Sequence, residues 1–150
     1  MLLSLLLGTA ITSLCLVLQS LALVAALRYF IRRANHLHAT FLHAEKVIIG
    51  LLVILIFGSL GQIGIWALLF FILGEFDNLK TAFYHSAVNF ATLGYGDVVM
   101  SQQHRLLGPL EAINGALMIG VSTAALARAF TTAIREQVNP KSKHDPNRWK

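Results

Sequence analysis

Three long apolar runs constrain the fold more than any other feature of the sequence. They cover residues 1–27, 47–73 and 106–134. A helix rises about 1.5 Å per residue, so each run is long enough to cross the roughly 30 Å hydrocarbon core of a bilayer. The first run is too long for the apolar part of a signal peptide and has no basic segment before it. The sequence therefore predicts an all-α membrane protein with three transmembrane helices.

Lysine and arginine gather in the segments that flank these runs. Residues 28–46 carry Arg28, Arg32, Arg33 and Lys46, with apolar residues at helical spacing, which predicts a basic amphipathic helix on the membrane surface. Residues 136–150 read as a flexible polar tail. The positive-inside rule places both segments in the cytoplasm and the N-terminus outside, as in a multi-pass protein of the plasma membrane. Topology thus explains the net charge of +5 without a nucleic-acid partner.

The sequence offers few residues for metal binding, disulfide formation or catalysis. Residues 28–46 contain His36, His38 and His43, which leave a metal site or a pH response open. His36 and His38 point to different faces of a helix, however, which favours a solvated polar face. A single cysteine, Cys15, excludes a disulfide within one chain. We find no recognised catalytic motif, and we expect neither an enzyme nor a cofactor or small-molecule substrate.

The second run contains residues suited to helix–helix contact. Gly50, Gly58, Gly61 and Gly64 can let another helix approach closely, and Gln62 is expected to form an interhelical hydrogen bond. After this run, Asp77 or Asn78 can cap a helix over residues 79–91. That helix is too short to span a bilayer, so a re-entrant pore helix is predicted.

The next segment, "TLGYGD" over residues 92–97, has poor helix and strand propensity. At membrane depth, irregular backbone persists only where it is buried in protein or lines water. Gly94 and Gly96 allow successive carbonyls to point the same way, and Thr92 adds a hydroxyl oxygen. A ring of carbonyls can replace the hydration shell of a cation. One loop supplies a fraction of such a ring, so several copies are needed around one axis.

This hexapeptide, between a short helix and a spanning helix, resembles the selectivity filter of bacterial potassium channels, here with an additional N-terminal transmembrane helix. The resemblance covers a pore domain at residues 47–135 and implies a homotetramer surrounded by lipid. It also implies potassium coordination by the filter residues Thr92, Leu93, Gly94, Tyr95 and Gly96. In the third run it implies a hinge at Gly115 and Gly120, although helix packing would also explain these glycines. Ile119 and Thr123 would line the cavity below the filter.

The sequence departs from the family pattern around the filter. Leu93 replaces a common valine, and Val88 stands where some relatives carry a glutamate. Asp97 therefore needs another partner, for which Tyr84 is a candidate donor. Glu111 on the third run is expected either to face the pore helix near Asn89 or His85, or to reach the outer interface.

The function implied is passive, selective conduction of potassium. Two alternatives remain at this stage: a weakly selective channel for monovalent cations, and a channel-like subunit of a potassium transport system. The intact filter tyrosine and glycines favour selectivity, and the chain has no internal repeat of the kind that transporters show.

Overall fold

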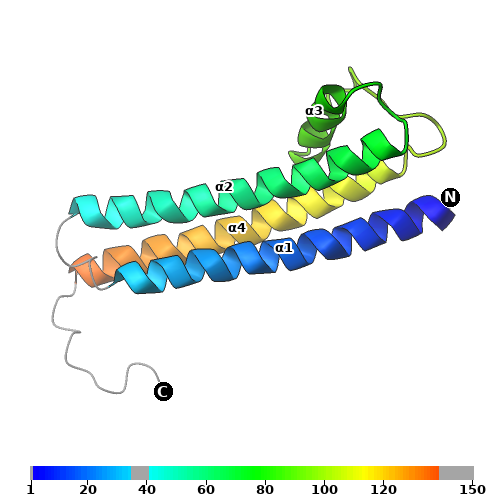
Figure 1. Ribbon diagram of the computed structural model, residues 1–150. Coiled ribbons are helices and arrows are strands. Elements are labelled where there is room, and N and C mark those ends of the chain that lie inside the picture. Colours follow the sequence, from blue (N-terminus) through cyan, green and yellow to red (C-terminus); the bar gives the residue numbers. More distant parts are fainter. Residues whose placement is uncertain (1, 35–40, 139–150) are drawn as a thin grey trace.

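The computed structural model describes residues 2–34 and 41–138, which form four helices and no strand. The helices are α1 (Leu2–Ala34), α2 (Phe41–Ile72), α3 (Leu79–Phe90) and α4 (Leu107–Val138). Figure 1 shows α1, α2 and α4 side by side in one long bundle, with the short α3 at the end where the N-terminus lies. The three long helices are long and apolar enough to cross a membrane. The all-α fold with three transmembrane helices is thus confirmed.

The linker differs from the separate helix expected over residues 28–46. Arg28 to Ala34 continue α1, whereas Phe41 to Lys46 begin α2. Residues 35–40, with His36 and His38, lie outside the described part of the chain, as do residues 139–150 of the expected tail. No glycine or proline interrupts α1 between Ala26 and Ala34, and arginine is a good helix former, so the helix continues past the apolar run.

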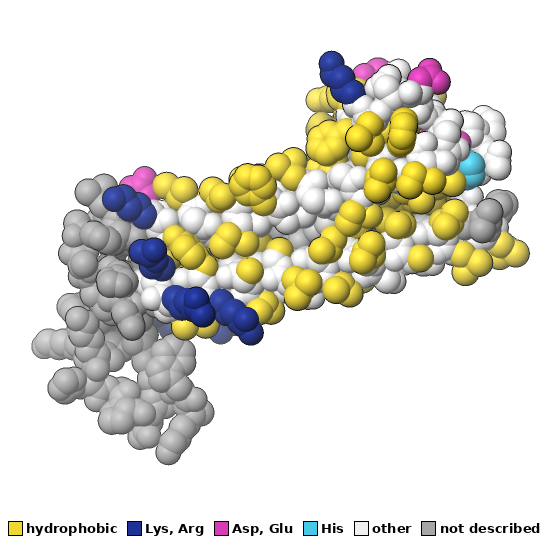
Figure 2. Space-filling view, in the orientation of Figure 1, with side chains coloured by type: hydrophobic (Ala, Val, Ile, Leu, Met, Phe, Trp, Pro, Cys, Tyr) yellow, Lys and Arg dark blue, Asp and Glu magenta, His cyan; other side chains and the backbone are white. Residues whose placement is uncertain are grey.

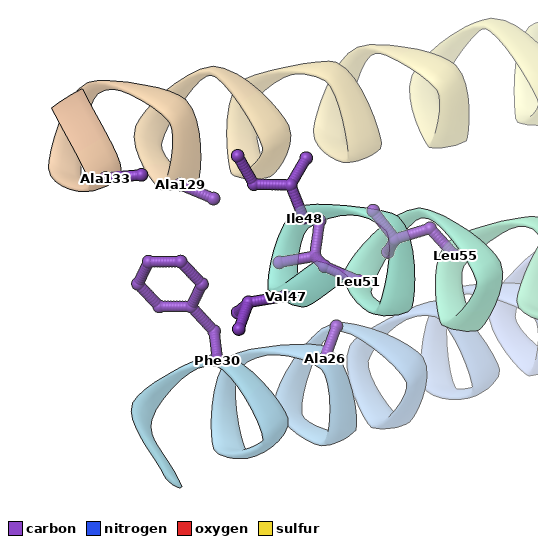
Figure 3. Packing of buried hydrophobic residues seen from close by; sticks show 8 residues of the cluster. All are labelled: Ala26, Phe30, Val47, Ile48, Leu51, Leu55, Ala129 and Ala133. Atoms are coloured by element: carbon purple, nitrogen blue, oxygen red, sulfur yellow. The ribbon is translucent and has the colours of Figure 1, made fainter. Parts of the chain in front are cut away.

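The N-terminal helix packs along both other long helices. Near the end of the bundle away from α3, a buried cluster joins all three (Figure 3): Ala26 and Phe30 of α1, Val47, Ile48, Leu51 and Leu55 of α2, and Ala129 and Ala133 of α4. Farther along, a Cβ added to Gly58 would lie 2.9 Å from the Ala22 Cβ, so this glycine permits close approach of α1 and α2. A Cβ added to Gly61 or Gly64 would meet nothing within 4 Å in this single chain.

A buried hydrogen-bond bridge also links the three long helices. Gln62 Nε2 of α2 donates to Gln19 Oε1 of α1 at 2.7 Å. Gln19 Nε2 in turn donates to Ser122 Oγ of α4 at 2.9 Å. Gln62 is fully buried and Gln19 is 3% exposed. The interhelical hydrogen bond expected of Gln62 is present, and its partner is the N-terminal helix.

Gln19→Leu is expected to lower the free energy of unfolding by about 1–2 kcal/mol, because it removes two hydrogen bonds and leaves Gln62 and Ser122 without these partners. Ser20→Ala is the matched control, since the adjacent Ser20 is exposed and bonds only the Val17 carbonyl of its own helix. Unfolding by increasing sodium dodecyl sulfate in mixed micelles measures both variants. Equal stability of the two would mean that the bridge contributes nothing.

Charged side chains divide between the two ends of the bundle, as Figure 2 shows. The end away from α3 carries most of the exposed basic residues described by the structure: Arg28, Arg32, Arg33, Lys46, Arg128 and Arg135. The α3 end carries acidic side chains together with the basic residues Lys80 and Arg105, and the surface between is mostly apolar. This is the distribution expected of a helical bundle that crosses a bilayer.

Candidate functional site

The short helix α3 is fixed at both ends by local hydrogen bonds. Asn78 is its N-cap, with Oδ1 accepting from the Thr81 backbone N–H at 2.8 Å. At the C-terminal end, the Thr92 N–H donates to the Asn89 carbonyl and the Leu93 N–H to the Val88 carbonyl. This pair of bonds is a Schellman motif, which requires a left-handed residue at the position that Thr92 occupies. The helix therefore leads directly into the TLGYGD loop.

The loop backbone alternates in handedness. Thr92, Gly94 and Gly96 have φ of 59°, 59° and 74°. Thr92 is the one non-glycine residue with positive φ among the residues that the structure describes. A β-branched residue rarely adopts this conformation, and such strain concentrates at functional sites. Alternating the sign of φ reverses every second peptide plane, so successive carbonyls can face one side instead of alternating as they do in a strand.

The loop is uncovered in the single chain. Every residue from Ala91 to Asp97 is exposed, including the apolar side chains of Leu93, at 55%, and Tyr95, at 65%. Large apolar side chains exposed together on an ordered loop mark a surface that contacts another molecule. The loop thus has the backbone of an oxygen-lined site but only one wall of it.

Three consecutive residues of α3 tie the loop and its exit to the helices. The first, Tyr84, donates its hydroxyl to Asp97 Oδ2 at 2.7 Å. This bond to the carboxylate raises the pKa of Tyr84. The structure thus brings together the tyrosine and aspartate that the sequence pairs.

The second residue, His85, holds the segment that follows the loop. Its Nδ1 lies 2.9 Å from the Val98 carbonyl oxygen, and its Nε2 lies 2.9 Å from Asn89 Nδ2. The ring also packs against the rings of Phe70 and Phe76, with centroids 5.5 and 4.9 Å away. Burial lowers the pKa of His85, although the Val98 carbonyl and nearby carboxylates act in the opposite direction.

The third residue, Ser86, connects α3 to both long helices behind it. Its hydroxyl lies 2.8 Å from the Ile63 carbonyl oxygen of α2 and hydrogen bonds with Glu111 Oε1 of α4. Asn89 also lies beside the Glu111 carboxyl. Glu111 is fully buried, so it faces α3 and does not reach the outer interface.

Gly115 lies where α4 crosses the C-terminal end of α3. A Cβ placed on Gly115 would overlap the Phe90 carbonyl oxygen and lie 2.7 Å from its carbonyl carbon. A Cβ on Gly120 would meet nothing within 4 Å. The two glycines expected to form a hinge therefore differ, because Gly115 is required for helix packing in this structure.

Below the loop, a groove of about 280 Å³ runs between α2 and α4. Its lining includes Ile119 and Thr123, the residues expected to face a cavity, together with Ser122 of the polar bridge. The rest of the lining is mainly aliphatic. The structure thus places both expected cavity residues on one face of α4.

A second cluster at this end of the bundle was not predicted from the sequence. Glu75 accepts from the Ser101 N–H at 2.6 Å and the Ser101 hydroxyl at 2.7 Å, and its Oε1 lies 2.6 Å from His104 Nδ1. Burial alone would raise the pKa of Glu75, but the bonds from His104 and Ser101 outweigh it and lower the pKa. The cluster joins the segment after α2 to the segment before α4, residues too far apart in sequence for a spacing pattern to reveal.

Within residues 2–34 and 41–138, no group of three or more His, Cys, Asp or Glu side chains could hold a metal ion. Of the linker histidines, His36 and His38 lie outside those ranges, and the side chain of His43 is not described. The oxygen atoms of the TLGYGD loop remain the candidate ion ligands.

Comparison with known proteins agrees with this geometry. A family model described as an ion channel matches residues 51–132, from α2 through the loop into α4. No curated protein and no solved structure matches the chain. The match covers more than half of the sequence and contains the loop, the three tethering residues of α3 and the Gly115 contact. The chain is a membrane protein that belongs to the ion channel family, which is a family of passive conductors and not a class of enzymes.

Proposed function

We propose that four copies of this chain assemble around one axis into a channel that conducts potassium selectively. The carbonyls of Thr92, Leu93, Gly94 and Tyr95, with the Thr92 hydroxyl, would then coordinate dehydrated K⁺ as it passes. Potassium is the transported ion in this proposal and no resident cofactor is required. Gly96 and Asp97 complete the loop, with Asp97 held by Tyr84.

One observation carries the proposal: positive φ alternates along an exposed loop at Thr92, Gly94 and Gly96. This alternation suits a row of carbonyls, and a row from one chain gives a fraction of an ion's coordination shell. The exposed Leu93 and Tyr95 side chains need cover that neighbouring subunits would supply. Fourfold assembly answers both requirements.

The charge distribution supports an orientation in the plasma membrane. Exposed arginine and lysine residues gather at the end away from α3, which the positive-inside rule assigns to the cytoplasm. The N-terminus and the loop would then face outside, with residues 28–46 and the C-terminus inside.

Purified protein in planar bilayers tests the proposal. With K⁺ on one side and an equal concentration of Na⁺ on the other, the reversal potential should be far from zero, with the sign expected when K⁺ is much more permeant than Na⁺. A reversal potential near zero would favour the weakly selective cation channel. Absence of current from the reconstituted chain would favour a subunit that needs other components for transport.

Two alanine variants test whether the loop, rather than a nonspecific leak, sets the potassium preference of the current. Gly94→Ala places a side chain at φ of 59° within the loop and is expected to lose potassium preference. Gly74→Ala is the matched control, since Gly74 has φ of 71° and equally open surroundings but lies outside the loop. Selectivity that survives Gly94→Ala would count against the loop as the filter.

A further inference from the structure

The half of α4 that lies away from α3 has two opposite faces. One face packs against α1 and α2 (Figure 3), and its residues recur at intervals of three or four: Ser122, Leu126, Ala129 and Ala133. The residue two positions after each of these is rotated by about 200° around the helix, so it belongs to the opposite face. These residues are all exposed in the single chain: Ala124, Arg128, Thr131 and Arg135. The open face of α4 therefore carries two arginines.

Arg128 lies inside a membrane span. The part of α4 that is long and apolar enough to cross a membrane runs from Leu107 to Arg135. An arginine within a span is costly in lipid, and such residues mostly face the interior of a helix bundle or a water-filled cavity. The acidic side chain described at this end, Glu45, lies near the start of α2 and not on this face. Arg128 therefore needs a polar environment beyond the single chain.

The faces that the three long helices leave uncovered differ in composition. α1 and α2 expose large apolar side chains, as expected of surfaces that contact lipid: Leu21, Val24, Leu27, Ile49, Ile56 and Phe57. The open face on this half of α4 instead combines alanine and threonine with the two arginines. The short helix α3, which leads into the TLGYGD loop, packs against α2 and α4 but not against α1. The open face of α4 is thus the one best suited to face an axis shared with other copies.

We propose that Arg128 and Arg135 of four copies ring the cytoplasmic entrance of the pore, and that this ring makes K⁺ current larger inward than outward. The inference rests on the proposed function, which supplies the fourfold axis and the orientation. Cation pores use rings of carboxylates, whereas rings of arginine suit anions. A positive ring lowers the local concentration of K⁺ that enters from the cytoplasm. K⁺ that enters at the loop is about 30 Å away along α4, which is beyond the Debye length of about 10 Å at 0.1 M salt.

Potassium currents in inside-out membrane patches, with equal KCl on both sides and no divalent cations, test the inference. At about 0.1 M KCl, inward current should exceed outward current about threefold at equal and opposite voltages. At about 1 M KCl the Debye length is about 3 Å, and the ratio should fall below about 1.5. Arg128→Gln combined with Arg135→Gln should give the low ratio at both salt concentrations. Arg128→Lys combined with Arg135→Lys keeps the charge and should keep the wild-type ratio.

Arg28→Gln combined with Arg32→Gln is the matched control, because it removes the same charge from the same end of the bundle. These arginines follow Ala26 and Phe30 by two residues, so they lie on the face of α1 away from the other helices. The control should have the wild-type ratio. The inference is wrong if neutralising the α4 arginines leaves the ratio unchanged, if both neutralised variants change it equally, or if the ratio does not depend on salt. The channel proposal survives each of these results.

Thiol cross-linking locates Arg128 without any current. In the assembled Arg128→Cys variant, a short bifunctional maleimide should join copies around one axis into dimers on a denaturing gel. Arg28→Cys, on the outer face of α1, should stay monomeric. The native Cys15 is fully buried and should not react. Cross-linked dimers without wild-type K⁺ current would refute the channel proposal while supporting Arg128 at the axis. Current without cross-linked dimers would overturn the ring alone.

Discussion

Gly115→Ala is expected to destabilise the folded chain by about 3 kcal/mol or more, and to reduce the yield of assembled protein correspondingly. The added methyl group would overlap the Phe90 carbonyl oxygen at the C-terminal end of α3. The methyl group would be fixed to the backbone of α4 and the carbonyl oxygen belongs to the backbone of α3, so no side-chain rotation can relieve the overlap. Relief requires α3 to move away from α4, and α3 carries the loop. Unfolding by detergent titration, with chromatographic measurement of assembly, reads both effects.

Gly120→Ala is the matched control on the same helix. A methyl group there meets no atom within 4 Å in the chain, and alanine has the higher helix propensity. Its stability should therefore equal or slightly exceed that of the wild type. Equal stability of both variants would show that the contact between Gly115 and Phe90 is looser than the structure has it. A conductance change in Gly120→Ala with unchanged stability would support flexibility at Gly120 as its role.

This difference between two glycines shows where sequence reasoning reached its limit. Apolar runs, the N-cap at Asn78 and the short length of α3 are local features, and they predicted the architecture. The spacing of Gly115 and Gly120 is also local, but their roles depend on which one meets Phe90, a residue far away in the sequence. Only the tertiary arrangement of α3 and α4 decides that.

The contacts that hold the loop also include some that the sequence predicts and some that it does not. The sequence pairs Tyr84 with Asp97 because Val88 stands where the family pattern has a glutamate, and the structure places Tyr84 and Asp97 in contact. The contact of His85 with the Val98 carbonyl was not predicted, since nothing in the sequence places its ring there. The positive φ of Thr92 was also not predicted, because threonine disfavours that conformation and the helix C-terminus imposes it. Local rules fail here at positions where the fold enforces an unfavourable choice.

The N-terminal helix was predicted as a span but not as part of the core. Its buried Gln19 bonds both Gln62 and Ser122, and Ser122 lies between the groove residues Ile119 and Thr123. An isolated polar residue in an apolar run does not reveal two partners on two helices. The continuation of α1 through its arginines is also not predicted, because a change from apolar to basic residues does not by itself end a helix.

Glu111→Ala is expected to lower the free energy of unfolding by about 3 kcal/mol, whereas Glu111→Gln should cost less than about 1 kcal/mol. Glu111 is fully buried in a spanning helix, and its Oε1 meets the hydroxyl of Ser86. That hydroxyl has one proton, yet both the Ile63 carbonyl and Glu111 lie within hydrogen-bond distance of it. Both contacts are satisfied together only if Ser86 donates to Ile63 and a protonated Glu111 donates to Ser86.

The Glu111→Gln variant distinguishes a protonated from an ionised Glu111. The glutamine side chain has nearly the same volume, and its amide N–H₂ can donate to Ser86 as a protonated carboxyl group would. Alanine removes the donor and leaves a cavity between α3 and α4. Detergent unfolding of both variants, with potassium flux as a second readout, measures the difference. If glutamine destabilises the protein as much as alanine, Glu111 is ionised, and the buried charge must then be stabilised by a partner other than Ser86. A small penalty for glutamine alone would mean that a neutral acid on α4 anchors α3 through Ser86.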